Sequence, residues 1–365
     1  MKKITHTKPY LSGHHKSELL KQFQSGMVNE GECCKKLIEK LATKFGHAGG
    51  VLQSTGTHAL ALAIQTLSMR LGCVSPRVLI SNYSCHCLID AVHIANGVPI
   101  LCDINSDNLS LCVDAIQKII AKNPIDIIIV PHMFGLPADI GKIEALGIPV
   151  IEDCAHSPGA RFKEQMVGSF SKLAVYSFEG SKILPAGEGG AVLANQHSMT
   201  EILIKTKCRK GSFHKHSRLS DIIASVVIAQ IKEYEVIIKR RQKIAKKYSQ
   251  YLSDLSAKGV IRLPKTYDDR EHIYYRYIIQ VSPKELQRLI KSANIAGILL
   301  KQPIATGPLS MTSFVKGRSF PNSFAVHSSS VSIPIYPDLK DKDIERIMTF
   351  LHVYEWRKIY ESPKF

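Results

Sequence analysis

Apolar and polar positions alternate with two different periods along this chain. Residues 32–45 (ECCKKLIEKLATKF) have helical spacing, with Leu37, Leu41 and Phe45 on one side. A glycine-rich turn at 46–50 precedes a short apolar run, a Ser/Thr/Gly turn and a second helical stretch at 59–71. A strand, a polar turn and a helix in this order point backbone N–H groups and the helix dipole towards a bound anion.

The same alternation continues to residue 152. The pattern predicts strands at 77–81, 99–103, 125–131 and 149–152, with helices between them at 87–96, 114–122 and 140–146. Short apolar strands that are separated by helices are typical of an α/β protein with a largely parallel sheet.

Beyond Gly159 the pattern changes. It predicts two shorter strands at 172–178 and 190–194, then a long helical stretch over 219–248 that is broken once. After Leu255 it predicts a strand at 272–281, a helix at 283–293, a strand at 331–335 and a last helix at 340–351. We therefore expect two domains, a large α/β domain over 1–250 that includes the N-terminal segment, and a small α+β domain over 251–365.

Charge and cysteine content narrow the class of protein. A net charge of +17 suggests anionic partners, but no aromatic interleaving or nucleic-acid motif accompanies the basic runs at 205–218 and 239–247. A basic background composition explains the charge as well as a function does, and we expect no nucleic-acid partner. The sequence has no signal peptide and no apolar run of about 18 residues, so no membrane association is expected. The nine scattered cysteines favour reduced thiols in a cytoplasm.

Two residues carry candidate chemistry. Asp153 ends a predicted buried strand, at the edge of an α/β sheet where ligands bind, although a capping aspartate is an equally good interpretation of this residue alone. Lys182 follows a strand and lies among apolar residues; burial would lower its pKa and make it a nucleophile for a carbonyl carbon. Taken alone, Lys182 is more simply a solvated loop cation. No metal is expected, since Cys85-His86-Cys87 lacks a second pair of ligands at zinc spacing.

Six ordered blocks together resemble the DegT/DnrJ/EryC1/StrS sugar aminotransferase family, over nearly the whole chain. STGTHALALAIQTL is similar to its phosphate-binding segment, and the stretch from VLISNYSCHC to VPILCDI to its strand–helix–strand unit. The run from PHMFG to VIEDCAHSPGARF contains its aspartate motif, and SFEGSKILPAGEGGAVL its lysine segment. RLSDIIASVVIAQIKEYEVIIKRRQKIAKKY and VSIPIYPDLKDKDIERI match later blocks.

The resemblance implies the type I fold of pyridoxal 5'-phosphate (PLP) enzymes, with a mostly parallel seven-stranded sheet in the large domain. It also implies roles for individual residues. Lys182 would bind PLP as a Schiff base and carry protons during catalysis, and Asp153 would pair with the pyridine nitrogen. His156 would lie beside the ring. Gly56 and Thr57, with Ser177, would hold the phosphate.

The chain departs from the family pattern at the ring and at the loop that precedes Arg218. Cys85-His86 replaces an aromatic residue that stacks on the ring, so either His86 stacks there or the small thiol takes its place. His216 stands where the family has an asparagine that contacts the phosphate in the partner subunit. Glu179-Gly180-Ser181 also replaces a turn that usually contains an aromatic residue. Substrate contacts are expected from the cations Arg218, Lys210 and Lys301.

The resemblance implies a homodimeric aminotransferase that works by two half-reactions. An amino acid donor, L-glutamate, would give its amine to the cofactor, and a nucleotide-linked keto sugar would take it, in surface-glycan or related amino-sugar biosynthesis. Lys182 favours this activity over related dehydratases, which have histidine at that position. Two alternatives stay open, a PLP enzyme that acts on a non-nucleotide substrate and a non-enzymatic regulatory relative.

Overall fold

A computed structural model describes residues 2–312 and 319–356. Its centre is a seven-stranded sheet in the order β1-β9-β8-β5-β4-β2-β3. The strands are β1 Gly49–Gln53, β2 Arg77–Ser81, β3 Val98–Cys102, β4 Ile127–Pro131, β5 Val150–Asp153, β8 Leu173–Ser177 and β9 Gly190–Ala194. Only β9 runs against the others, because it pairs antiparallel with both β1 and β8 while the remaining neighbours pair parallel. The predicted mostly parallel α/β sheet is confirmed.

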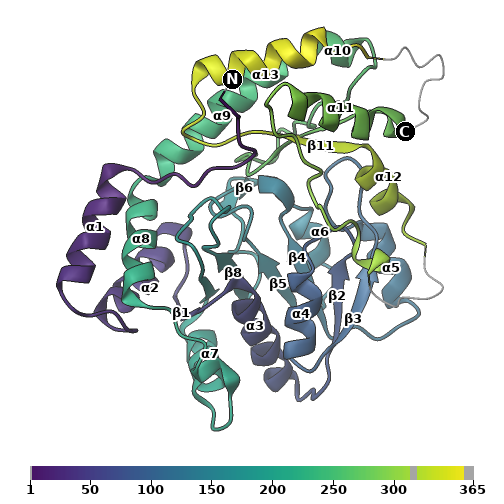
Figure 1. Cartoon of the computed structure of the whole chain (residues 1–365). Coiled ribbons are helices and arrows are strands. Elements are labelled where there is room, and N and C mark those ends of the chain that lie inside the picture. Colours follow the sequence, from purple (N-terminus) through teal and green to yellow (C-terminus); the bar gives the residue numbers. More distant parts are fainter. Residues whose placement is uncertain (1, 313–318, 357–365) are drawn as a thin grey trace.

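Both faces of the sheet are buried, which explains why its strands read as nearly continuous apolar runs. Along β4, Ile127 and Ile129 belong to one core and Ile128 and Val130 to the other. Helices α3 Gly56–Leu71, α4 Cys87–Ile94 and α7 His197–Cys208 cover the first face. Helices α2 Glu32–Phe45, α5 Val113–Ile120, α6 Ile140–Glu144 and α8 Asp221–Lys232 cover the second. Figure 1 shows α3 and α4 side by side against the sheet.

The C-terminal third forms a smaller layer above the carboxyl ends of the sheet strands (Figure 1). Its antiparallel pair β10 Tyr277–Gln280 and β11 Ser330–Ile333 packs with helices in a separate apolar core. These helices are α9 Tyr234–Tyr251, α10 Ser253–Ala257, α11 Pro283–Ile295, α12 Pro321–Ser329 and α13 Asp341–Val353. Helix α9 contributes Ile237 to the core of the large layer and Tyr248 to that of the small one. We propose a domain boundary near residue 250, as the sequence suggests.

Several predicted elements are confirmed and others differ. The long helical stretch breaks at Glu233, which separates α8 from α9, as expected. Helix α1 Gly13–Gln24, helix α7 and the hairpin of β6 Arg161–Phe162 with β7 Gln165–Met166 were not predicted. No helix in the described ranges is long and apolar enough to cross a membrane.

The strand predicted over 272–281 is wrong in its first half. Only Tyr277–Gln280 is a strand, because the backbone before it bonds to other partners. The N–H of Ile273 donates to the carbonyl of Gly135 (2.9 Å), and the carbonyls of Tyr274 and Tyr275 accept from Arg241 (3.1 and 3.2 Å). Tyr274 has a φ of +51°, which interrupts the extended conformation.

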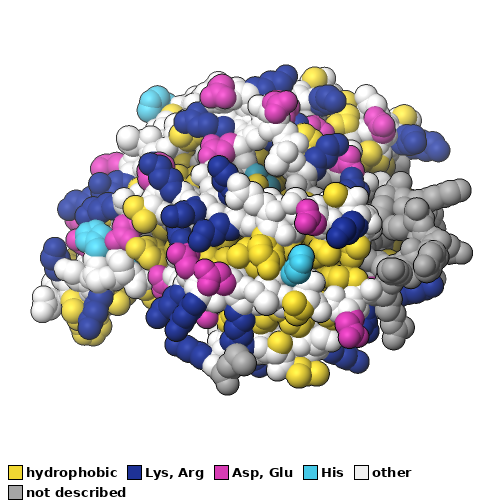
Figure 2. Space-filling view, turned by 90° about the horizontal axis from the view of Figure 1, so that it is seen from above, with side chains coloured by type: hydrophobic (Ala, Val, Ile, Leu, Met, Phe, Trp, Pro, Cys, Tyr) yellow, Lys and Arg dark blue, Asp and Glu magenta, His cyan; other side chains and the backbone are white. Residues whose placement is uncertain are grey.

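The basic side chains are not gathered in one continuous patch on the face that Figure 2 shows. Lys and Arg alternate there with Asp and Glu, and apolar side chains are exposed in a band near the middle. This arrangement agrees with the sequence, in which the excess of Lys and Arg over Asp and Glu is spread along the chain. On this face there is no single basic track of the kind that follows a nucleic-acid backbone.

Candidate active site

One cavity of about 430 Å³ lies at the carboxyl ends of β5 and β8, where ligands bind in open α/β sheets. The N-terminus of α3 and the start of α4 border it, together with residues from the C-terminal layer. Seven predicted site residues line this cavity, namely Gly56, Thr57, Cys85, Asp153, His156, Ser177 and Lys182. Segments more than 120 residues apart in sequence are thereby brought together at the edge that the pattern predicted.

The N-terminus of α3 forms a narrow cradle beside the end of β8. Thr55 caps the helix by accepting a hydrogen bond from the N–H of His58 (3.1 Å). A Cβ on Gly56 would lie 3.0 Å from Cβ and Oγ of Ser177, tighter than an ordinary contact, so glycine at this position lets the helix approach β8 without displacing that side chain. The first N–H groups of a helix have no partner within it, and a hydroxyl lies beside them here. A phosphate group fits these donors.

Asp153 presents a buried carboxylate to the cavity. Its Oδ1 accepts from the N–H of Ala155 (3.0 Å), and its own carbonyl accepts from the N–H of His132 (3.1 Å), which fixes the end of β5. Burial raises the pKa of Asp153, although the nearby Lys182 opposes the shift. A buried carboxyl with this shift is stabilised as an anion by a cationic ring N–H. The pyridine nitrogen of PLP supplies such a group.

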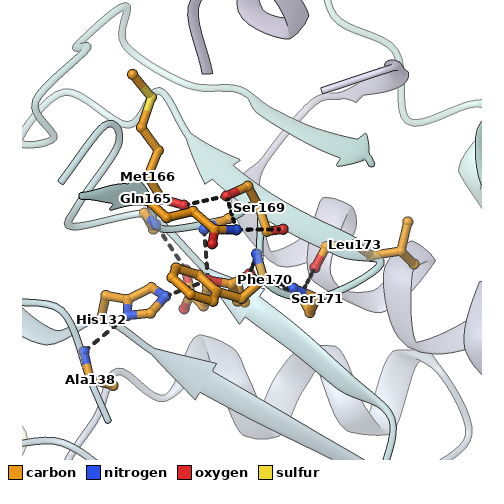
Figure 3. A network of polar contacts seen from close by, with 12 residues as sticks. His132, Ala138, Gln165, Met166, Ser169, Phe170, Ser171 and Leu173 are labelled. Carbon is orange, nitrogen blue, oxygen red and sulfur yellow. Dashed lines mark hydrogen bonds and ion pairs between the residues drawn. The ribbon is translucent and has the colours of Figure 1, made fainter. Parts of the chain in front are cut away.

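A second buried carboxylate, Glu152, anchors the loop behind the site. It accepts from the N–H groups of Gly168 (2.6 Å), Phe170 (2.9 Å) and Ser171 (2.8 Å). It also accepts from Nε2 of His132 (3.0 Å), whose Nδ1 accepts from the N–H of Ala138 (3.1 Å). Figure 3 shows His132 between Ala138 and the turn from Gln165 to Leu173.

Burial would raise the pKa of Glu152, but the hydrogen bonds from His132 and the backbone amides hold it below its usual value. The carboxylate is therefore ionised at neutral pH and fully bonded. Since it directly precedes Asp153 in β5, this network fixes the strand from which Asp153 enters the cavity.

Lys182 lies on a loop that returns to β9 through backbone hydrogen bonds. The N–H of Gly180 donates to the carbonyl of Gly187 (2.9 Å), and that of Ala186 to Phe178 (2.8 Å). We expected burial to lower the pKa of Lys182, and this expectation is wrong. Burial does act in that direction, but the interactions with Tyr275, the thiols of Cys87 and Cys85, and Asp153 outweigh it and raise the pKa. The amine therefore carries a proton at neutral pH.

His156 is held between two aromatic rings. Its centroid lies 4.2 Å from that of Tyr275 and 5.8 Å from that of Phe134, with interplanar angles of 22° in both pairs. The N–H of Phe134 donates to Nδ1 (3.4 Å), so the proton of the neutral ring belongs on Nε2. Burial lowers the pKa of His156, which keeps the imidazole neutral. His156 is therefore suited to donate one hydrogen bond rather than to carry charge.

The structure places Cys85 rather than His86 at the cavity wall. The thiol of Cys87, which also lines the cavity, donates to Cys85. The imidazole of His86 instead lies 3.0 Å from Oγ1 of Thr312. Of the two side chains that the sequence offered, the small thiol lines this cavity and the imidazole does not; which of them lies beside the cofactor ring stays a prediction.

Besides His86, four predicted residues do not line this cavity. His216 and Arg218 are exposed, and Arg218 contacts Glu30 across 3.8 Å. Lys210 borders a different hollow beside Phe213 and Gln65. Lys301 is exposed and joins Ser332 through backbone hydrogen bonds. Their roles stay predictions, and those of residues 210–218 require the partner subunit that the resemblance implies.

Sequence reasoning missed several residues of the cavity. Tyr275 and Arg276 enter from the irregular segment before β10, which we had taken for a strand. Glu188 and the stretch 303–306 also line the cavity. The sequence holds no clear signal for these residues, because the alternating pattern of 272–281 and its tyrosines are typical of a strand.

Comparison with known proteins agrees with this geometry. A sequence profile of the DegT/DnrJ/EryC1/StrS aminotransferase family matches residues 9–352. The UDP-N-acetyl-3-dehydro-alpha-D-glucosamine 3-aminotransferase of Acidithiobacillus ferrooxidans is 26% identical over 329 residues, which cover 87% of this chain and 87% of that protein.

Two solved structures share the fold. The aminotransferase TlmJ from Streptoalloteichus hindustanus superposes with a TM-score of 0.86 at 22% identity, over 95% of this chain and 97% of that one. Spr1654 from Streptococcus pneumoniae, solved in a PLP form, superposes with a TM-score of 0.84 at 20% identity, over 95% and 97% of the two chains. The type I fold implied by the sequence is confirmed.

Proposed function

The chain belongs to the DegT/DnrJ/EryC1/StrS aminotransferase family, and from this premise we propose that it transfers an amino group from L-glutamate to a nucleotide-linked keto sugar. It is a PLP-dependent aminotransferase of amino-sugar and polysaccharide biosynthesis. The main support for the proposal is that Lys182, Asp153 and the N-terminus of α3 line the same cavity. Bound there, PLP withdraws electrons from the carbon that carries the transferred amine.

Each residue of the chain has a distinct task in this proposal. Gly56, Thr57 and Ser177 hold the phosphate, and Asp153 keeps a proton on the pyridine nitrogen. Lys182 attaches the cofactor and, once the amino acid has displaced it, moves a proton as general base and then as general acid. His156 would donate from Nε2 to the bound cofactor, and Cys85 would form part of the wall around it, since both line the same cavity.

Two observations support a nucleotide-linked sugar as the substrate, namely the positive charge of one segment and the similarity to a known relative. The diphosphate of such a substrate is attracted by cations, and the segment 205–218 is rich in them. The relative from Acidithiobacillus ferrooxidans, by its name, acts on a UDP-linked sugar. Arg218, Lys210 and Lys301 are the cations that we propose for the substrate, which approaches from solvent at the rim of the cavity.

We further propose a homodimer in the cytoplasm. His216 and Arg218 lie outside the cavity of their own chain, and a second chain would bring them to it. All nine cysteines are free thiols, a state that a reducing compartment maintains.

The first test is the absorbance of the purified protein with PLP. We expect a visible band that borohydride makes permanent, and we expect Lys182→Ala to lose this covalent attachment while it still binds PLP reversibly. Glutamate should bleach the band, and 2-oxoglutarate should restore it. The control is Lys172→Ala, an exposed lysine just before β8 that does not line the cavity.

Two results would overturn parts of the proposal. A protein that never takes up PLP would exclude the aminotransferase reaction and favour a regulatory relative. Normal bleaching by glutamate without turnover of any UDP-, dTDP- or GDP-linked keto sugar would favour the non-nucleotide substrate, an alternative that the departures at Cys85 and His216 already motivate.

A further inference from the structure

Two cysteines that are separated by one residue lie in the wall of the candidate cofactor cavity. Cys85 and Cys87 both line it, whereas the imidazole of the intervening His86 lies 3.0 Å from Oγ1 of Thr312. Cys87 begins α4, and the carbonyl of Cys85 accepts a hydrogen bond from the N–H of Leu88 (3.2 Å). This turn fixes the backbone around the two thiols, so both side chains reach the same cavity in a defined geometry.

The backbone brings the two residues within reach of a disulfide bond. His86 has helical torsion angles (φ −55°, ψ −26°), so the Cα atoms of Cys85 and Cys87 are separated like those of residues two apart in a helix, by about 5.5 Å. Disulfides join residues whose Cα atoms are roughly 4.4–6.8 Å apart. The thiol of Cys87 also donates a hydrogen bond to Cys85, so the two sulfur atoms are neighbours. A bond between them therefore requires side-chain rotation and no large backbone movement.

Cys85 is the thiol of this pair that is better placed to react first. It directly precedes the N-terminal turn of α4, whose first backbone N–H groups are not capped by any side chain of the described residues. Lys182 lines the same cavity. Helix N-termini and nearby cations stabilise a thiolate, which is the reactive form of cysteine. The hydrogen bond from Cys87 acts in the same direction, and it keeps the proton on Cys87 as the second thiol.

We propose that Cys85 and Cys87 are an oxidisable dithiol, which hydrogen peroxide converts to an intrachain disulfide when no cofactor is bound. The thiolate of Cys85 attacks one peroxide oxygen and becomes a sulfenic acid, and the hydroxide that leaves takes a proton from solvent. The thiol of Cys87 then attacks this sulfur, which forms the disulfide and releases water. Two thiols are oxidised and one peroxide is reduced to two molecules of water.

The cofactor enters this proposal only as a shield. PLP in the cavity would cover the thiols that line it, so the protein should oxidise mainly while it lacks the cofactor. This protection rests on the proposed function, whereas formation of the disulfide does not.

The other cysteines have different surroundings. The thiol of Cys34 donates to the carbonyl of Leu219 (3.4 Å), and that of Cys73 to Oδ2 of Asp126 (3.8 Å), so both face oxygen acceptors. Cys208 is exposed at the end of α7, far in sequence from any other cysteine. A metal ion suits the pair less well, because no group of three or more possible ligands occurs within the described ranges and a structural zinc site needs four.

The test treats the purified protein with hydrogen peroxide, with and without PLP, and analyses its peptides by mass spectrometry. Chymotrypsin cleaves after Tyr83 and Leu88, which leaves a peptide that contains these two cysteines and no other. Without PLP, we expect this peptide to lose the mass of two hydrogen atoms and dithiothreitol to restore it. Saturating PLP should slow the reaction several-fold. Cys87→Ser should instead accumulate a sulfenic acid on Cys85 that dimedone labels.

Two further variants complete the design. Cys85→Ser should form neither the disulfide nor the dimedone product in this peptide. The matched control is Cys208→Ser, which removes an exposed thiol outside the cavity and should leave the oxidation of the pair unchanged. Phenylarsine oxide tests the pairing without an oxidant, because its arsenic atom bridges two neighbouring thiols. The peptide should retain it in the wild type and lose it in Cys85→Ser and in Cys87→Ser.

Several results would overturn the dithiol. These are a wild-type peptide that stays reduced, one that stops at the sulfenic acid, and a disulfide that joins Cys85 to a different cysteine. A protein that binds PLP but oxidises at the same rate with it would overturn the shielding. Failure of the proposed function looks different, since the disulfide would still form while PLP gave no visible band at all.

Discussion

At the scale of single residues, Glu152 and Asp153 differ although they are neighbours at the end of β5. Alternate residues of a strand point to opposite faces, so the two carboxylates enter different surroundings. Glu152 meets three backbone amides and His132, which lower its pKa, whereas Asp153 keeps one amide and its pKa is raised. The hydrogen-bonding capacity of Glu152 is therefore used within the protein, whereas Asp153 can still accept a hydrogen bond from a ligand.

Cys85 offers a prediction at the same scale. The hydrogen bond from Cys87 lowers the pKa of Cys85 to about 6, so we expect iodoacetamide to alkylate this thiol rapidly at pH 7 and slowly at pH 5. PLP should protect it, because the thiol lines the cofactor cavity. Peptide mass spectrometry measures the labelling. The fully buried Cys154 should remain unlabelled, and rapid labelling that PLP does not slow would contradict the placement of Cys85.

The location of a site residue could be predicted where the residue belongs to a short sequence motif. Asp153 ends β5, Gly56 opens α3 and Lys182 lies in the loop after β8, so their place in sequence indicates their place at the sheet edge. Tyr275 could not be found in this way, because its position depends on contacts that are distant in sequence. Arg241 donates to its carbonyl, and the N–H of the nearby Ile273 donates to the carbonyl of Gly135. The sequence also could not give the protonation state of Lys182. Burial lowers its pKa and neighbouring groups raise it, and the balance depends on how close those groups lie to the amine.

At the scale of elements, the turn between β7 and β8 depends on a single side chain. We expect Glu152→Gln to lower the free energy of unfolding by about 3–5 kcal/mol. The carboxylate accepts hydrogen bonds from several buried donors, and the amide of glutamine cannot accept all of them. Urea unfolding of the two proteins at pH 7 measures this difference. Glu235→Gln is the control, since its partner Lys44 lies in an exposed pair (2.6 Å) that contributes little.

The pH dependence of this effect has a definite sign. The pKa of Glu152 is lower in the folded protein than in the unfolded chain, so its contribution is complete above the unfolded pKa and is lost as pH falls through the folded one. The gap between wild type and Glu152→Gln should therefore narrow below about pH 4. A gap that stays constant to pH 3 would contradict an ionised Glu152.

Helices and strands were predicted well where burial of one face, or of a whole strand, gives a regular pattern of apolar residues. The bounds of α2 and β9 agree with the pattern, because each has a fixed apolar face or a fully buried strand. Helix α1 was missed since most of its side chains are exposed or half-buried, and only His15 is fully buried. The first half of the strand predicted at 272–281 failed for the opposite reason. Its apolar side chains are buried, but its backbone pairs with a loop instead of a strand.

At the scale of the whole molecule, the proposed dimer predicts complementation. We expect Lys182→Ala and Arg218→Ala each to be inactive, since one lacks the attached lysine and the other a cation donated to its partner. After mixed refolding, hybrid dimers would contain one intact site of two, so about a quarter of wild-type activity should return. Sugar-nucleotide turnover measures it. No recovery in a mixture that sediments as dimers would place Arg218 at the active site of its own chain.

The contribution of Tyr275 and residues 303–306 to the cavity has a consequence for biosynthesis. On a ribosome, Lys182 emerges about 5–20 s before Tyr275, since chains grow at roughly 5–20 residues per second. During that interval α3, β5 and β8 are already available, but the wall formed by Tyr275 and residues 303–306 is still inside the ribosome. A nascent chain should therefore hold the vitamin B6 cofactor in an open site that water enters freely, and the site should first become enclosed when the C-terminal layer has been made.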